Sequence, residues 1–109
     1  MEIVGRKIIL KFTRGDATLE KAFNDFLAAV TAANWQNDAE VKNTFHRADR
    51  ILGGFYVFDI GSNRNLSLVL FNKGQFEIIW AGNHDDYEAT FKNNKDTIKK
   101  FLKKKGYNL

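Results

Sequence analysis

Phe55-Tyr56-Val57-Phe58-Asp59-Ile60 is the stretch of this 109-residue chain that decides the fold. Aromatic and β-branched residues fill it, and turn-forming segments bound it on both sides, Gly53-Gly54 before it and Gly61-Ser62-Asn63 after it. This composition predicts a β-strand between two turns. Two more apolar runs follow, Leu66 to Phe71 and Phe76 to Ala81, with a short glycine-containing turn between them. Strands joined by such short turns predict an antiparallel meander.

Helices are expected on the amino-terminal side of this meander. After a short apolar strand at Ile3 and Val4, residues Arg6 to Arg14 carry apolar side chains at near-helical spacing. Gly15-Asp16 breaks that helix, and Ala17 to Asn34 then repeats apolar side chains every three or four residues. The second segment is strongly amphipathic, so its apolar stripe needs another element to cover it. The sequence therefore predicts a helical hairpin packed against the sheet.

Three more helices complete the predicted fold. Asp38 is expected to cap a weaker helix, and His84 to Phe91 reads as a short helix after the last strand. Lys95 to Lys105 predicts a final helix, which Gly106 would end. Because helices precede a run of strands, we expect the α+β class with the helices on one face of the sheet. No repeat, linker-like segment or proline interrupts the chain, which predicts one domain over residues 1–109.

The composition narrows the classes of protein and of site. The chain has no cysteine, which rules out disulfides and thiolate metal ligands, and its two histidines disfavour a transition-metal site. No apolar run approaches the roughly 18 residues that span a bilayer, and the amino terminus lacks the apolar stretch of a secretory signal. We therefore expect a cytoplasmic protein that contacts no membrane and needs neither a cofactor nor a metal.

Positive charge is concentrated at the carboxyl-terminal end. The formal net charge is +4, but the segment from Lys92 to Leu109 alone holds seven lysines and one acidic residue. The other 91 residues carry ten basic and twelve acidic side chains. Clustered lysines can follow a phosphate backbone. The alternative is that these lysines only form the solvated face of a terminal helix.

The histidines are the first candidates for proton transfer near neutral pH. His84 precedes Tyr87 by three residues, so in a helix the two side chains would share a face. In one interpretation His84 acts as acid or base, and Tyr87 stacks on a nucleobase or shares the proton transfer. In the other, His84 caps the helix and Tyr87 packs in the core. We interpret His46 as a surface histidine.

Several segments of the chain occur in an informative order. They are Ile3 to Lys7, Trp35 to Phe45 followed by Ala48-Asp49, Phe55 to Asn63, and His84 to Glu88. The first resembles a strand that ends in a basic pair, and the second a helix that begins with an aromatic residue and is followed by a small residue and Asp. The third resembles an aromatic strand with its Gly-Ser-Asn turn, and the fourth a His-x-Glu-Tyr-Asp element. These are features of HigB-type toxins in the RelE/ParE superfamily. The resemblance covers roughly residues 3 to 91.

The resemblance implies a RelE-like fold and an activity. The fold has an amino-terminal helical hairpin against a twisted antiparallel sheet, here with a carboxyl-terminal helix, and its active surface is the concave face of the sheet. The implied activity is metal-independent cleavage of mRNA, usually at the ribosome. The implied partner is a HigA-like helix-turn-helix antitoxin, and the pair represses its own operon, so contact with DNA would come only through the antitoxin complex.

The resemblance also assigns roles to residues. The basic pair would hold the RNA backbone or the transition-state charge, and an exposed pair without a role is the alternative. The lysine-rich final helix would contact ribosomal RNA. The resulting candidates are His84, Tyr87, Arg64 and Lys7 for catalysis, and Arg6, Lys99, Lys103 and Trp80 for RNA binding.

Two departures from the family pattern bear on catalysis. The family's arginine on the strand after the turn is expected where this chain has Ser67, and Arg64, expected in the turn, could reach the same phosphate. Without a substitute cation, the chain would be a catalytically impaired protein that binds only RNA or antitoxin. Trp80 stands where the family tends to have a charged residue. It is either a stacking platform for a nucleobase or part of the core.

Overall fold

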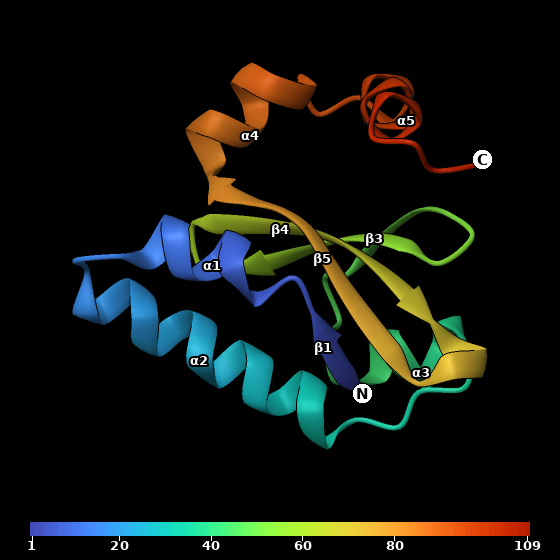
Figure 1. Ribbon diagram of the computed structural model, residues 1–109, viewed down its shortest axis with the longest axis horizontal. Coiled ribbons are helices and arrows are strands. Elements are labelled where there is room, and N and C mark those ends of the chain that lie inside the picture. The colour runs from blue at the N-terminus through green and yellow to red at the C-terminus, as the bar shows by residue number, and fades with distance from the viewer.

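The computed structural model describes residues 1–109, which form five α-helices, one 3-10 helix and a single five-stranded sheet. The strands lie side by side in the order β1-β5-β4-β3-β2, and Figure 1 labels all of them except β2. The elements in chain order are β1 (Glu2–Val4), α1 (Arg6–Thr13), α2 (Ala17–Ala32), α3 (Asp38–Thr44), β2 (Asp49–Leu52), β3 (Phe55–Ile60), β4 (Asn63–Leu70), η1 (Phe71–Lys73), β5 (Gln75–Asn83), α4 (His84–Phe91) and α5 (Lys95–Lys104).

The sheet contains the predicted meander and one further strand on each side of it. β3, β4 and β5 are antiparallel neighbours, and the strand predicted over Phe55 to Ile60 is confirmed at both ends. β2 is an additional antiparallel neighbour of β3. β1 pairs with β5 in parallel, with Ile3 opposite Phe76. The sheet is therefore mixed, which corrects the expectation of a wholly antiparallel one.

Gly5 makes the junction between β1 and α1. Its φ is +89°, and a Cβ at this position would lie 2.7 Å from the carbonyl oxygen of Ile78 on β5. Only glycine allows both the left-handed conformation and so close an approach. The chain consequently turns from β1 directly into α1, which runs alongside β5.

The α1–α2 hairpin covers one face of the sheet, as the sequence predicts. The side chain of Asp16 caps α2 by accepting a hydrogen bond from the Leu19 backbone N–H at 3.0 Å. The apolar stripe of α2 is buried, and Phe26 lies 5.5 Å from Phe58 and 6.0 Å from Phe76 between ring centroids. The larger hydrophobic core forms here, between the hairpin and the inward residues of β3, β4 and β5.

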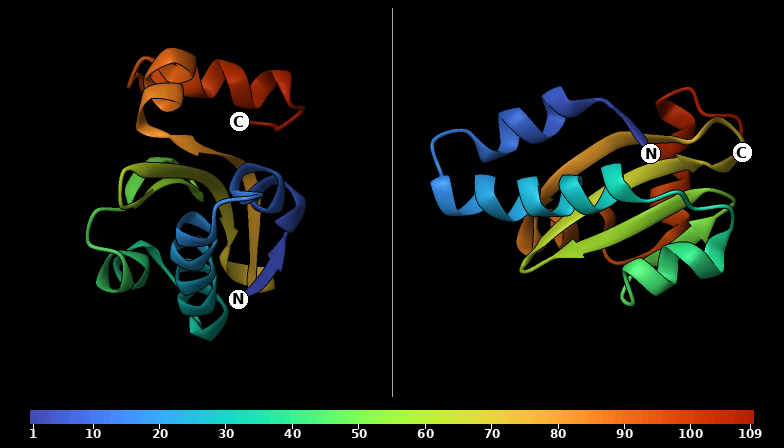
Figure 2. Two further views of the ribbon diagram at one scale, coloured as in Figure 1. Left: turned by 90° about the vertical axis from the view of Figure 1, so that its left-hand side faces the viewer. Right: turned by 90° about the horizontal axis from the view of Figure 1, so that it is seen from below.

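The second face of the sheet is also covered, which corrects the expectation that all helices lie on one face. Figure 2 shows α2 in front of the strands and α5 behind them. Phe91 of α4 and Leu102 of α5 are fully buried against a second apolar cluster that includes Val57 and Leu66. The cause is visible in β3, whose apolar run is continuous instead of alternating, as in strands buried on both faces.

The capping of α3 differs from the prediction. Asn37, not Asp38, caps this helix, because its side chain accepts the Glu40 N–H at 3.0 Å. Asp38 lies within the first turn and accepts a hydrogen bond from the Tyr56 hydroxyl at 2.6 Å. That bond ties α3 to β3. Gly106, with φ +97°, follows the last helix as expected.

None of these helices combines the length and the apolar composition that a crossing of the bilayer requires.

Candidate functional site

The second face of the sheet changes from apolar to polar at the end nearest the β3–β4 turn. Along β3, Phe55 and Val57 belong to the second core, and alternation places Asp59 on the same face. Arg64 of β4 lies directly opposite Asp59 and shares its face with the buried Leu66. Helices α4 and α5 cover the apolar middle of this face. The polar end therefore remains as the candidate site.

Arg64 is fixed at this end by three protein contacts. Its Nε lies 3.2 Å from Oδ1 of Asp59, and its Nη1 donates to the carbonyl oxygens of Gly61 at 3.3 Å and Asn63 at 2.9 Å. Arg64 lies on β4 and not in the turn, which corrects the sequence-based placement. Its side chain is 19% exposed, and Nη2 has no protein partner. The site thus offers a positioned cation with a free nitrogen.

Tyr87 of α4 also reaches this end of the sheet, where the charge of Arg64 is among those that act on its hydroxyl. Its ring is buried against Trp80 and Phe91, so the core-packing interpretation holds for the ring. The hydroxyl has no protein partner, yet no buried side-chain polar atom lacks one, so the hydroxyl reaches solvent. Burial, and then the charges of Asp49 and Glu88, raise the pKa of Tyr87. The phenol keeps its proton at neutral pH and can donate it.

His84 is the first residue of α4, and it lies at the same end of the sheet. Its backbone N–H donates to the carbonyl oxygen of Ser62 in the β3–β4 turn at 2.8 Å. Its imidazole is half exposed, with Nε2 3.6 Å from Glu88 and Nδ1 3.7 Å from Asp85. Asn83, not His84, caps α4 through its side chain. The imidazole of His84 points outward, whereas the ring of Tyr87 points toward the sheet. Glu88 is close to both side chains.

Ser67 lies outside this site. Its side chain is fully buried, and its hydroxyl donates to Oδ1 of Asn65 at 2.7 Å. Alternation along β4 places both residues on the face that the hairpin covers, together with Val69. An arginine at this position would point into the main core. Arg64 is the one basic residue of β4, and it is the strand's only cation at the polar end.

Trp80 packs as part of the core. Its ring meets Phe91 edge-on at 5.2 Å, and it lies across Gly82, where a Cβ would be 2.5 Å from Cη2. A β-bulge opposite Leu66 turns both Ile79 and Trp80 toward the second face. Trp80 keeps a half-exposed side, which contributes to a shallow hollow between α1 and α5.

The other predicted contacts lie elsewhere on the molecule. Arg6 and Lys7 are exposed in the first turn of α1, directly after Gly5, which lies against Ile78 of β5. Ile78 precedes His84 by six residues, which is about 20 Å along an extended strand. The structure does not bring this basic pair to the polar end. Lys99 and Lys103 follow Lys95 at helical intervals of four along α5. Lys95 lies 3.4 Å from Asp49, which directs the start of this row toward β2.

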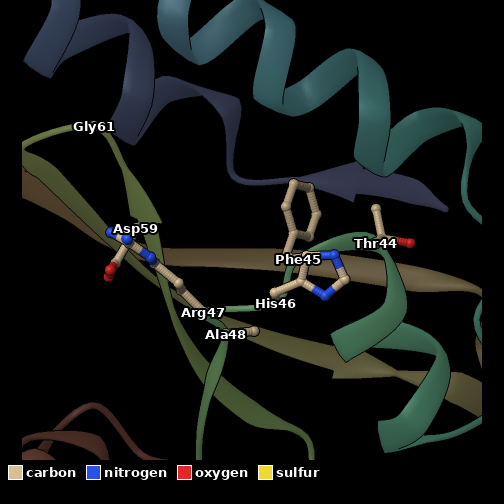
Figure 3. A pocket seen from close by; sticks show the side chains of 7 residues that line it. All are labelled: Thr44, Phe45, His46, Arg47, Ala48, Asp59 and Gly61. Carbon is tan, nitrogen blue, oxygen red and sulfur yellow. The ribbon is translucent and has the colours of Figure 1, made fainter.

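A hollow of about 350 Å³ opens next to Asp59, and no pattern in the sequence predicted it. Figure 3 shows the Arg47 side chain extending toward Asp59, while the His46 ring points away from it. His46 is exposed, as expected of a surface histidine, but it stands on the rim of the hollow. In the sequence, Asp59 stands out as the lone charged residue of an apolar strand, whereas no sequence pattern marks Arg47 as a site residue. The lining residues are Thr44, Phe45, His46, Arg47, Ala48, Asp59 and Gly61.

No group of three or more His, Cys, Asp or Glu side chains is arranged to hold a metal ion. The candidate site consists instead of a fixed arginine, a protonated phenol, an exposed imidazole and surrounding carboxylates.

The comparison with known families agrees with this architecture. Residues 19–90 match the model of the HigB_toxin family, described as the RelE-like toxic component of a toxin–antitoxin system. No curated protein matches the chain. The match includes Arg64, His84 and Tyr87 and leaves α1 and α5 outside it. Because it covers about two thirds of the residues, and because the α+β architecture with its amino-terminal hairpin is RelE-like, the chain belongs to the HigB_toxin family of RelE-like toxins from toxin–antitoxin systems.

Proposed function

We propose that this toxin is a metal-independent endoribonuclease that cuts mRNA, acts on the ribosome, and is silenced by a HigA-like helix-turn-helix antitoxin. Membership of the family means that the chain is the toxin of a toxin–antitoxin system and has an antitoxin as its partner. The nuclease activity, its site and the kind of antitoxin are the proposal. The observation that carries it is the Arg64 cation, held by Asp59 and two backbone carbonyl oxygens at the polar end of the sheet, where the backbone of His84 also joins the β3–β4 turn.

Cleavage of RNA without a metal needs three functions from side chains. A base takes the proton of the 2′-OH, whose oxygen then attacks the adjacent phosphorus. A cation stabilises the extra negative charge of the phosphorane. An acid protonates the departing 5′-oxygen, so the products are a 2′,3′-cyclic phosphate and a 5′-hydroxyl. Each positioned proton donor or acceptor contributes on the order of 10²–10⁴-fold, and charge stabilisation contributes about as much or more.

The residues at the polar end fit these functions. Arg64 stabilises the phosphorane through its free Nη2, and Asp59 keeps its guanidinium in place. Tyr87 is the proton donor, because its hydroxyl reaches solvent at this end of the sheet and a raised pKa keeps it protonated at neutral pH. His84 is half exposed and takes the proton from the 2′-OH, while Glu88 orients it and balances its charge. Lys7 has no part in this arrangement, because it lies on α1.

The alternative is a catalytically impaired relative that binds only RNA or the antitoxin. One observation favours it: Asp59 offsets much of the charge of Arg64, and α4 and α5 cover the remainder of the face with apolar residues. In this case the lysines of α5, including Lys99 and Lys103, would contribute to affinity without any cleavage.

Induced expression in a bacterial host distinguishes the two functions. Wild type is compared with Arg64→Ala, His84→Ala and Tyr87→Phe, and with Lys73→Ala as an exposed control in η1, at the opposite end of β4 from Arg64. Growth is scored and mRNA 5′ ends are mapped. The nuclease requires growth arrest and new 5′ ends in wild type and in the control, both reduced in the three site variants. Normal growth and intact mRNA from folded wild-type protein would support the binding protein.

A further inference from the structure

A hollow beside Arg47 adjoins the proposed active site. It opens between the loop that joins α3 to β2 and the end of β3. Asp59 lines the hollow and also contacts Arg64, so the two places share a side chain. A polymer held at Arg64 therefore continues into the hollow or passes over it.

Arg47 is the residue of the hollow that is free to bind a ligand. It is exposed, and no protein atom forms a hydrogen bond or ion pair with it. Asp59, the acidic residue nearest to it in the hollow, is already engaged by Arg64. The guanidinium fork suits the oxygens of a phosphate, which it contacts through two N–H groups. His46 on the rim adds a second nitrogen donor or acceptor.

The dimensions and the lining suit one nucleotide and no larger ligand. A volume of about 350 Å³ is at the lower limit of small-molecule pockets. The hydroxyl of Thr44 is already used, since it accepts from Trp35 Nε1 and donates to Glu40. Phe45 packs against Phe26 and Phe58 in the core. Arg47 and His46 remain, so the hollow recognises a phosphate and one polar edge instead of a full base pair.

We propose that this hollow binds the nucleotide next to the cleaved phosphate in a single RNA strand, with Arg47 on the phosphate and His46 against the base or sugar. The inference rests on the proposed nuclease for the identity of the neighbouring phosphate. It adds two binding residues, neither of which is among the candidates from the sequence. The cation pair Arg47 and Arg64, with Asp59 between them, then holds two successive phosphates.

Binding of a short RNA that cannot be cut tests this without relying on activity. A fluorescent single-stranded oligonucleotide with 2′-deoxy sugars is titrated with wild type, Arg47→Ala, Arg47→Gln and the control Lys73→Ala, and anisotropy is recorded from low to high salt. Loss of one phosphate contact lowers the salt slope by about 0.7, which equals about a fivefold loss of affinity near 0.1 M salt. We expect this loss in both Arg47 variants and not in Lys73→Ala. Thermal melts establish that each variant is folded.

A second measurement locates the RNA. The same oligonucleotide with one 4-thiouridine is irradiated on the protein, and the cross-linked peptide is identified by mass spectrometry. Cross-links to residues 44–48 are expected, and they would be lost in Arg47→Ala. Equal affinity and slope in Arg47→Ala and wild type, or an equal loss in Lys73→Ala, would overturn the proposal. So would cross-links confined to α5.

The two proposals fail in different ways. If wild type cuts no message in cells but Arg47 still carries a phosphate contact, the nuclease falls and the RNA-binding hollow remains. If wild type cuts message and Arg47→Ala binds and cuts normally, the nuclease remains and the hollow has no role in RNA binding.

Discussion

Asp59 and Arg64 face each other across β3 and β4, with Arg64 Nε 3.2 Å from Asp59 Oδ1. Both side chains are mostly shielded from solvent, at 29% and 19% exposure. The register of the β3–β4 hairpin therefore sets the position of the cation, because its two-residue turn leaves no slack. The same carboxylate lines the hollow that contains Arg47. One acidic residue thus holds Arg64 in place and borders the hollow in which Arg47 stands free.

Replacing Asp59 tests whether this organisation matters. Asp59→Asn keeps the shape of the side chain and removes its charge, so Arg64 loses its partner but keeps the two backbone contacts. We expect about 1 kcal/mol lower stability, a fall of about 4–8 °C in Tm for a chain of this size, and about tenfold slower cleavage from the looser guanidinium. Urea unfolding and ribosome-dependent mRNA cleavage measure the two effects.

Arg64→Lys is the companion variant. It keeps a positive charge but cannot reproduce the three fixed nitrogen positions. If Arg64→Lys cuts mRNA as fast as wild type, cleavage does not need the fixed geometry of a guanidinium. Asp59 would then have no role in positioning a catalytic cation.

Two tyrosines of this fold provide a matched pair that separates chemistry from packing. The Tyr87 hydroxyl has no protein partner, whereas the Tyr56 hydroxyl donates to Asp38 at 2.6 Å. Tyr87→Phe is expected to unfold within about 0.5 kcal/mol of wild type but to cut mRNA about 10²-fold more slowly or worse. Tyr56→Phe is expected to lose about 1 kcal/mol of stability and to keep its cleavage rate.

The readouts for this pair are a denaturant curve and mapped 5′ ends from the same preparations. A large loss of stability in Tyr87→Phe would show that its hydroxyl is structural. Full activity in that variant would remove Tyr87 as the proton donor and leave the acid to another group.

Local sequence patterns predicted most of this fold, because glycines and turns separate the elements. The strand over Phe55 to Ile60 and the helix over His84 to Phe91 match at both ends. β2 was missed because it has four residues, of which Asp49 and Arg50 are charged. The parallel pairing of β1 depends on the close contact between Gly5 and Ile78, which no local pattern contains.

The sequence predicted only part of the candidate site, because contacts between distant segments position the rest. His84 and Arg64 come together because the end of β5 meets the β3–β4 turn, an outcome of the predicted meander. Ser67, expected where the family has its arginine, lies on the opposite face of β4 from Arg64, because neighbouring positions of a strand alternate between faces. Arg47 was overlooked, since its hollow exists only when its loop folds back on Asp59.

The Asp38–Tyr56 hydrogen bond predicts a response to acid. The Tyr56 hydrogen bond, and to a lesser degree Lys42, lower the pKa of Asp38 below its ordinary 3.8. A carboxylate whose folded pKa is depressed adds stability above its unfolded pKa, and this stability is lost as the pH falls through the folded pKa. Wild type should therefore lose stability relative to Tyr56→Phe as the pH falls below about 4.

The measurement is urea unfolding of both proteins at pH 7 and at several values below pH 4. The difference in unfolding free energy between the two proteins should shrink with acid. The contribution is modest because the Asp38 side chain is 40% exposed and solvent screens it. A constant difference across this range would mean that the hydroxyl does not depend on the charge of Asp38.

Gly5 and Gly15 offer a controlled test of how the hairpin is joined to the sheet. Both have positive φ, +89° and +79°, but only Gly5 lies against another strand, where a Cβ would be 2.7 Å from the Ile78 carbonyl oxygen. Around Gly15 there is nothing within 4 Å. Gly15→Ala is therefore expected to cost only the conformational strain, about 1 kcal/mol, while Gly5→Ala adds a backbone clash that β1, α1 or β5 must move to relieve. We expect Gly5→Ala to lose at least twice as much free energy of unfolding as Gly15→Ala and to weaken protection of the β1 and β5 amides in hydrogen exchange. Equal losses in the two variants, with unchanged amide protection, would mean that the close approach of β1 to β5 does not hold the edge of the sheet together.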